Sequence, residues 1–247
     1  MADRLAMSAL PKAILFDLDE TIISFGSRRQ ILQEVIEEFG DVFAPFTPQA
    51  AGQAMEDGFR AFWSDEARAA VWRQNLVEGR ILAVEQGFST LRPQAPALTT
   101  EFARAFGARF HAYREEQAKF FPGALETIQA LRARNVLLAL VTNGAAAPQR
   151  AKVERFALAP LFHHIQIEGE AGFGKPQEQA YLHAMRTLDV APQETWMVGD
   201  NLEWEVAAPQ RLGIFSIWHD HLGEGVPAGS NVRPDRIIRS IAELKPE

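Results

Sequence analysis

Short apolar runs alternate with amphipathic segments along most of this chain. In the second half, the apolar runs lie at residues 136–141, 165–167, 195–198, 214–217 and 236–238. Short apolar runs bounded by turn residues are typical of buried parallel strands. Residues 13–16 form one more run of this kind, far ahead of the others.

The segments between these runs carry apolar residues at helical spacing. They predict a helix with Leu125, Ile128 and Leu131 on one face, helices at 148–156, 176–188 and 202–212, and a last helix after residue 238. Strands that alternate with helices over short links predict a doubly wound parallel sheet with right-handed crossovers.

The block between Ile22 and about residue 117 has a different pattern, because its periodicity is helical throughout. The expected helices cover 28–39, 48–63 with Thr47 as N-cap and Pro48 in the first turn, a segment from Ser64 to the Trp72 region, and 100–117. We therefore predict an α/β fold: a Rossmann-like core of residues 1–24 and 118–247, interrupted after its first strand by an all-helical cap domain, residues 25–117.

Composition narrows the functional classes. The 247 residues are 47% hydrophobic and 23% charged, which is ordinary for a globular protein. A net charge of −7 argues against a nucleic-acid partner, and the absence of cysteine excludes disulfides, thiolate metal sites and cysteine nucleophiles. No apolar stretch is long enough for a signal sequence or a membrane span, so we expect a cytoplasmic protein without a membrane partner. We expect the protein to be a monomer or a homodimer.

Polar residues follow three of the predicted strands. Asp17 and Asp19 come after the first, Thr142 and Asn143 after the run at 136–141, and Asp200 after the run at 195–198. In an open α/β sheet the ligand crevice lies beyond the carboxyl ends of the strands, so we expect these groups to meet.

Lys175, between Gly174 and Pro176, adds an ammonium group ahead of a predicted helix. Alone, each segment has a simpler interpretation: an Asx-turn at Asp17, a turn at Asn143-Gly144, an exposed lysine, or a helix cap at Asp200. Together, carboxylates, a hydroxyl and one ammonium suit phosphoryl chemistry with a metal ion.

The ordered set resembles the four motifs of the haloacid dehalogenase superfamily, especially its phosphatases with a helical cap after the first motif. The resemblance implies that Asp17 is the nucleophile and forms an aspartyl-phosphate, and that Asp19 is the general acid and base. It further implies that Thr142, the Asn143 backbone and Lys175 hold the phosphoryl group. Mg²⁺ would be held by Asp17, the Asp19 main-chain carbonyl and Asp200.

Two positions depart from the family pattern. Glu205 stands where the last motif usually has a second aspartate, so we expect it either to reach the metal, directly or through water, or to orient Lys175. Pro209 stands within the helix predicted at 202–212, which it should kink or shorten.

Asp19 decides between reactions within the superfamily, because its dehalogenases lack the second acid and a halide leaves without a proton. We therefore expect a Mg²⁺-dependent phosphomonoester hydrolase that acts on a small phosphorylated metabolite. A phosphosugar mutase and a catalytically silent phosphoester-binding module are the alternatives.

Overall fold

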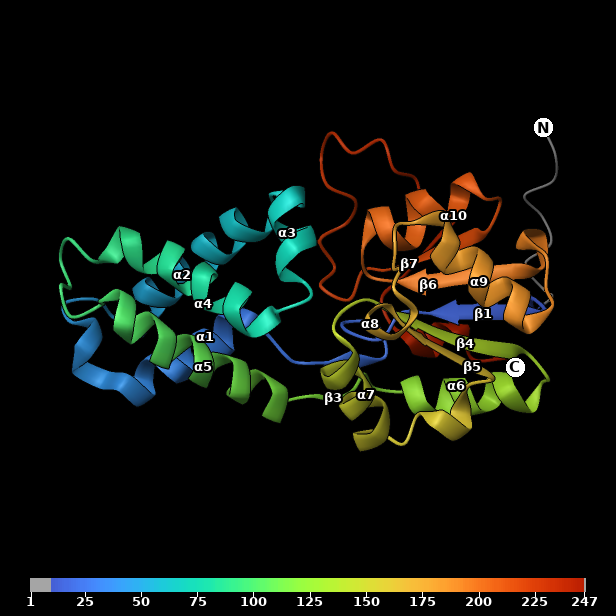
Figure 1. Cartoon of the computed structure of the whole chain (residues 1–247), viewed down its shortest axis with the longest axis horizontal. Helices are drawn as coiled ribbons and strands as arrows, with labels where there is room; N and C mark the ends of the chain where they lie inside the picture. Colours follow the sequence, from blue (N-terminus) through green and yellow to red (C-terminus); the bar gives the residue numbers. More distant parts are fainter. Residues whose placement is uncertain (1–9, 247) are drawn as a thin grey trace. The chain divides into compact units, whose positions relative to one another are not determined.

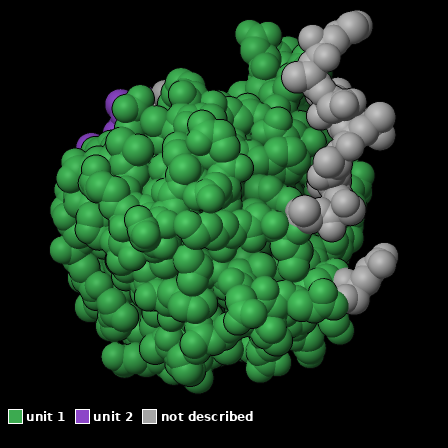
Figure 2. All heavy atoms as spheres, turned by 90° about the vertical axis from the view of Figure 1, so that its right-hand side faces the viewer, with its two compact units in different colours: residues 1–24, 120–247 green, residues 25–119 purple. Residues whose placement is uncertain are grey.

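A computed structural model describes residues 10–246 of the chain. It divides the chain into two compact units, Met1–Ser24 with Phe120–Glu247, and Phe25–Lys119, which Figure 2 colours separately. The first is called the core unit below and the second the helical unit. Among the described residues, no helix combines the length and the apolar character that crossing a bilayer requires.

A six-stranded parallel sheet is the centre of the core unit (Figure 1). Its strand order is β5-β4-β1-β6-β7-β8. The strands are β1 (Ala13–Phe16), β4 (Leu137–Thr142), β5 (His164–Ile167), β6 (Thr195–Gly199), β7 (Phe215–His219) and β8 (Arg236–Ile238). The predicted doubly wound α/β fold is thus confirmed. Strand β1 lies between β4 and β6, both of which come later in the chain.

Helices cover both faces of this sheet (Figure 1). On one face, Ala13 and Leu15 of β1 pack with Tyr181 and Met185 of α9 (Glu178–Leu188). The helical segments of the core unit are α6 (Ala124–Ala133), α7 (Ala146–Arg155), α8 (Glu168–Ala171), α9 and α10 (Ala208–Arg211), with short turns η2 (Ala159–Leu161), η3 (Pro192–Glu194), η4 (Leu202–Ala207) and η5 (Ile241–Leu244). Since both faces of β1 are covered, all four of its residues are fully buried.

Three predicted elements of the core unit differ from the structure. The helix expected at 202–212 begins as a π-helical turn, η4, and continues as α10. The helix expected from Pro176 begins at Glu178, because Gln177 is its N-cap residue. The last helix is a single 3₁₀ turn, η5. Proline explains the first difference, since it cannot donate the hydrogen bond of a regular helical turn.

The helical unit contains α1 (Arg28–Phe39), η1 (Gly40–Phe43), α2 (Pro48–Trp63), α3 (Glu66–Trp72), α4 (Leu76–Leu91) and α5 (Thr100–Glu116). Two short strands, β2 (Ile23–Ser24) and β3 (Lys119–Phe120), pair where the chain passes from one unit to the other. Its buried core is rich in aromatic rings, among them Phe43, Phe88 and Phe106, whose centroids lie 5.5–5.8 Å apart.

Two sequence interpretations of this unit were incomplete. Ser64 caps the end of α2, and Asp65 is the residue whose side chain accepts a hydrogen bond at the start of α3. Helix α4, which begins after Asn75 and runs to Leu91, was not predicted from the sequence. Its glycines at 79 and 87 weaken the helical pattern, since glycine is a poor helix former.

Helices α2 and α4 approach each other at two glycines. A Cβ atom at Gly58 would lie 2.5 Å from the backbone nitrogen of Gly87 and 2.6 Å from its Cα. The backbones therefore touch at this point, and no side chain fits between them.

We predict that Gly58→Ala lowers the free energy of unfolding by about 1–3 kcal/mol through overpacking. Alanine forms helix better than glycine by about 1 kcal/mol, so propensity alone would give the opposite sign. Gly52→Ala in the same helix is the matched control, because its Cβ would meet only the flexible Gln33 side chain. Urea unfolding of both variants measures the difference, and equal stabilities would contradict the close approach.

Candidate active site

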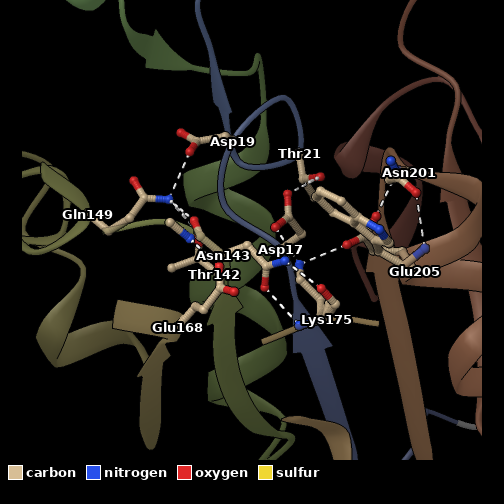
Figure 3. A network of polar contacts seen from close by, with 12 residues as sticks. Asp17, Asp19, Thr21, Thr142, Asn143, Gln149, Glu168, Lys175, Asn201 and Glu205 are labelled. Carbon is tan, nitrogen blue, oxygen red and sulfur yellow. Dashed lines mark hydrogen bonds and ion pairs between the residues drawn. The ribbon is translucent and has the colours of Figure 1, made fainter. Parts of the chain in front are cut away.

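The carboxyl ends of three adjacent strands bring the predicted motifs together. Phe16 of β1 is in register with Leu140 of β4 and with Val198 of β6, so the residues after these strands share one edge of the sheet. The backbone N–H of Asp17 donates to the carbonyl of Val198 at 2.9 Å, which continues this pairing into the first motif. Figure 3 shows the polar contacts at this edge.

Asp17 lies between a lysine and a threonine (Figure 3). Lys175 Nζ donates to Asp17 Oδ1 at 2.6 Å, and Thr21 Oγ1 donates to Asp17 Oδ2 at 3.1 Å. The backbone N–H groups of Ile22 and Ile23 both donate to the Leu18 carbonyl, and this turn brings Thr21 back to Asp17. Burial raises the pKa of Asp17, although Lys175 opposes that effect.

Lys175 is fully buried and has a second carboxylate partner. Its ammonium forms an ion pair with Glu205 Oε1 at 2.7 Å, while Glu205 Oε2 accepts a hydrogen bond from the Asn201 backbone N–H at 2.7 Å. Burial alone would lower the pKa of Lys175, but the carboxylates of Asp17 and Glu205 outweigh it and raise that pKa. The ammonium therefore stays charged, and it fixes the orientation of both acids.

Glu205 reaches Lys175 by passing beneath Gly199. A Cβ atom at Gly199 would lie 2.0 Å from Glu205 Cγ and 2.7 Å from Cδ. Burial, partly offset by Lys175, raises the pKa of Glu205 to about 7. Because glycine has no Cβ atom, position 199 leaves the space that the Glu205 side chain occupies.

The loop after β4 is tied to the segment that carries Lys175. The Asn143 side chain accepts from the Lys175 backbone N–H at 2.8 Å and donates to the Lys175 carbonyl at 2.6 Å. Glu168 Oε2 accepts from the Gly144 backbone N–H at 2.9 Å. The side chain of Asn143 thus has a structural task of its own, apart from the phosphoryl contact expected of its backbone.

Asp19 has partners on α7. Lys152 Nζ donates to both of its carboxylate oxygens, at 2.8 and 2.9 Å, and Gln149 Nε2 donates to Oδ2 at 2.9 Å. The same Gln149 nitrogen lies 2.7 Å from Thr142 Oγ1 and 2.7 Å from the Asn143 carbonyl oxygen. Asp19 and the loop after β4 therefore share one helix as support.

Asp200 follows β6, at the sheet edge shared with Asp17. Its backbone carbonyl accepts from Trp218 Nε1 at 2.7 Å, which holds the loop against β7. Burial and the negative charges of Asp17, Glu205 and Glu20 raise the pKa of Asp200 well above its ordinary value. A carboxylate whose surroundings are this negative is stabilised by a cation.

A divalent metal ion fits this donor set. No three His, Asp or Glu side chains within residues 10–246 converge on one cation position. Mg²⁺ does not require three, since it is commonly bound by one or two carboxylates, with waters and substrate oxygens completing the octahedron. Asp17, Asp200 and the Asp19 carbonyl suit this type of site, whereas Glu205 is only 1% exposed and its carboxylate lies against the Lys175 ammonium and the Asn201 N–H.

The π-helical turn η4 accommodates Pro209. The Ala208 N–H donates to the Glu203 carbonyl, five residues back, and Pro209 has no N–H to continue the series. The buried hydroxyl of Tyr181 on α9 donates to the Trp204 carbonyl in this turn. This wide turn, which comes just before Pro209, also contains Glu205, the partner of Lys175.

Several residues of this site were not found from the sequence: Gln149, Lys152, Glu168 and Tyr181. One signal was present for two of them. Gln149 and Lys152 are three residues apart and share a helical face with Val153, the face that should be apolar. Polar residues on a buried face require partners, which indicates a site.

Comparison with known proteins agrees with this geometry. Residues 11–213 match the haloacid dehalogenase-like hydrolase family. A phosphoserine phosphatase from Thermus thermophilus is 30% identical over 251 residues, covering 94% of this chain and 97% of the relative. A glyceraldehyde 3-phosphate phosphatase from Methanopyrus kandleri is 26% identical over 211 residues, covering 83% of this chain and 82% of the relative.

Solved structures show the same fold. The haloacid dehalogenase-type hydrolase YfnB from Bacillus subtilis, solved with bound magnesium, has a TM-score of 0.68 at 21% identity, covering 96% of this chain and 97% of that one. The fold and the sequence match together define a hydrolase. The chain belongs to the haloacid dehalogenase-like hydrolase family, which confirms the resemblance found in its motifs.

We predict that Gly199→Ala destabilises the protein by about 1–3 kcal/mol, because the new methyl group overlaps the Glu205 side chain. A double-mutant cycle with Glu205→Ala isolates the overlap. In the Glu205→Ala background the Cγ and Cδ atoms are gone, so Gly199→Ala should cost much less. Additive changes in unfolding free energy would contradict the steric explanation.

Proposed function

We propose that this hydrolase is a phosphomonoesterase that acts on a small phosphorylated metabolite through an aspartyl-phosphate on Asp17. The observation that carries the proposal is the 2.6 Å contact between Lys175 and Asp17, at the sheet edge shared with Thr142 and Asp200. An isolated carboxylate repels a phosphate dianion. Here the buried ammonium offsets that repulsion and orients the nucleophile.

In the first step, an Asp17 oxygen attacks phosphorus and the bond from phosphorus to the ester oxygen breaks. Protonated Asp19 gives its proton to the leaving oxygen, so the alcohol departs neutral. Thr142, the Asn143 backbone and Lys175 hold the phosphoryl oxygens as their charge redistributes.

In the second step, Asp19 takes a proton from a water molecule, and the resulting oxygen attacks phosphorus. The acyl-phosphate bond breaks, which releases inorganic phosphate and restores the Asp17 carboxylate. Asp19 regains the proton that it lost, and the cycle is balanced.

Asp17, Asp200 and the Asp19 carbonyl would hold Mg²⁺. When bound, the ion neutralises charge on the phosphoryl oxygens and on Asp17. We assign Glu205 to Lys175 rather than to the metal, because its carboxylate is buried and forms an ion pair with that ammonium at 2.7 Å.

Two further observations support phosphate esters as substrates. The relatives from T. thermophilus and M. kandleri are named for phosphate monoesters. The chain also has Asp19, the second acid that an alkoxide leaving group requires. A halide leaving group needs no such acid.

We predict that purified protein releases phosphate from p-nitrophenyl phosphate and from members of a phosphorylated-metabolite panel when Mg²⁺ is present, and that EDTA stops the release. Asp17→Asn should lower kcat by at least about 10³-fold, since it removes the nucleophile.

Asp189→Asn is the matched control, because Asp189 is exposed and its left-handed backbone also suits asparagine. The control should retain wild-type activity. Full activity of Asp17→Asn would refute the covalent mechanism, and no activity of the wild type across the panel would refute the phosphomonoesterase assignment.

Glu205→Gln tests the role of that side chain. We expect a fall in kcat of about 10–100-fold, as for other groups that orient a reacting residue, with the Mg²⁺ concentration for half-maximal activity changed by less than about threefold. Glu203→Gln, on the same turn but exposed and paired with Arg211, should behave as wild type. A tenfold or larger rise in the Mg²⁺ requirement of Glu205→Gln would instead make Glu205 a metal ligand.

A further inference from the structure

Helix α7 places two polar side chains on its buried face, one turn apart. Gln149 is 3% exposed and Lys152 is 8% exposed. Burying a lysine ammonium is costly unless a carboxylate compensates it. The compensation at Lys152 comes from Asp19, both of whose oxygens lie within 2.9 Å of Nζ.

The two contacts to α7 fix the orientation of the Asp19 carboxylate. Lys152 binds both oxygens and Gln149 binds one of them, so rotation about the Asp19 side-chain bonds breaks at least one contact. Gln149 also contacts Thr142 and the Asn143 carbonyl. The helix therefore sets the position of Asp19 relative to the loop after β4.

Lys152 and Lys175 each form an ion pair with a different aspartate of the first motif. Lys175 contacts Asp17, and Lys152 contacts Asp19. Each reacting carboxylate thus has an ammonium of its own from a different part of the chain.

We propose that Lys152 is a positioning residue for Asp19 that stabilises the negative charge which develops there during the first step. The inference rests on the proposed function. As the O–H bond of Asp19 breaks and the O–H bond of the departing alcohol forms, the carboxylate becomes charged 2.8 Å from the Lys152 Nζ atom. Lys152 therefore assists proton donation and does not itself react.

The test compares two leaving groups. One substrate is an alkyl phosphate that the wild-type enzyme hydrolyses, and its alkoxide leaving group must be protonated as it departs. The other is 2,4-dinitrophenyl phosphate, whose dinitrophenolate leaves without a proton. The measured quantity is kcat/KM, which reports the steps through formation of the phosphoenzyme. For Lys152→Met we expect kcat/KM to fall about 10²-fold for the alkyl ester, the usual size of general acid catalysis, and less than about threefold for the dinitrophenyl ester.

Variants that keep the positive charge at position 152, or remove one elsewhere on α7, serve as controls. Lys152→Arg keeps the positive charge and should restore the ratio of the two kcat/KM values to within about threefold of wild type. Arg150→Met removes a cation from the same helix, one whose partner is Glu170, and should leave the ratio unchanged. Lys152→Gln, which keeps a polar side chain, replaces Lys152→Met if circular dichroism shows that the latter fails to fold.

The outcomes separate this inference from the proposed function. Equal losses for both esters in Lys152→Met, or a ratio in Lys152→Arg as low as in Lys152→Met, would overturn the role of Lys152 while leaving the phosphomonoesterase intact. A wild-type protein that cleaves neither ester would instead defeat the proposed function, before any variant is compared.

Discussion

The contact on which the site depends is the buried ammonium of Lys175 between Asp17 and Glu205. A charged group in the interior is stable only with opposite charges close by, and here there are two. If either carboxylate were absent, the other would have to balance the ammonium alone. The position of Lys175 is also fixed from outside the ion pairs, since Asn143 binds its backbone N–H and carbonyl. Strand β1, the loop after β4 and the turn after β6 are thus connected through one residue.

The parallel sheet makes this arrangement possible. Because β1 lies between β4 and β6, residues that are over a hundred positions apart in sequence follow neighbouring strand ends. The register aligns Phe16 with Leu140 and Val198, so no long loop is needed to bring the motifs together. A site built at strand ends is also stiff, because β1 is buried on both faces.

Much of the core could be predicted from sequence because its signals are local. Apolar runs followed by Asp17, Thr142 and Asp200 indicate strands with site residues at their carboxyl ends, even though the sequence does not say which strands pair. The sequence left Glu205 two possible partners, the metal and Lys175, because the direction of its side chain depends on the width of the turn η4 and on the space at Gly199. The support of Asp19 by Lys152 was also hidden, because it joins residues 133 positions apart. Helix α4 was missed for the opposite reason, since its glycines weaken the local pattern and its packing against α2 outweighs their low propensity.

The interlocked pair of Gly199 and Glu205 has a consequence for how this sequence can change over time. With glutamate at 205, a Cβ atom at 199 overlaps the Cγ and Cδ atoms of that side chain, so a substitution at 199 is costly while the glutamate is present. Replacement of Glu205 by alanine removes both atoms, and the same substitution at 199 then costs less. The order in which the two positions change therefore decides how much stability the intermediate protein loses.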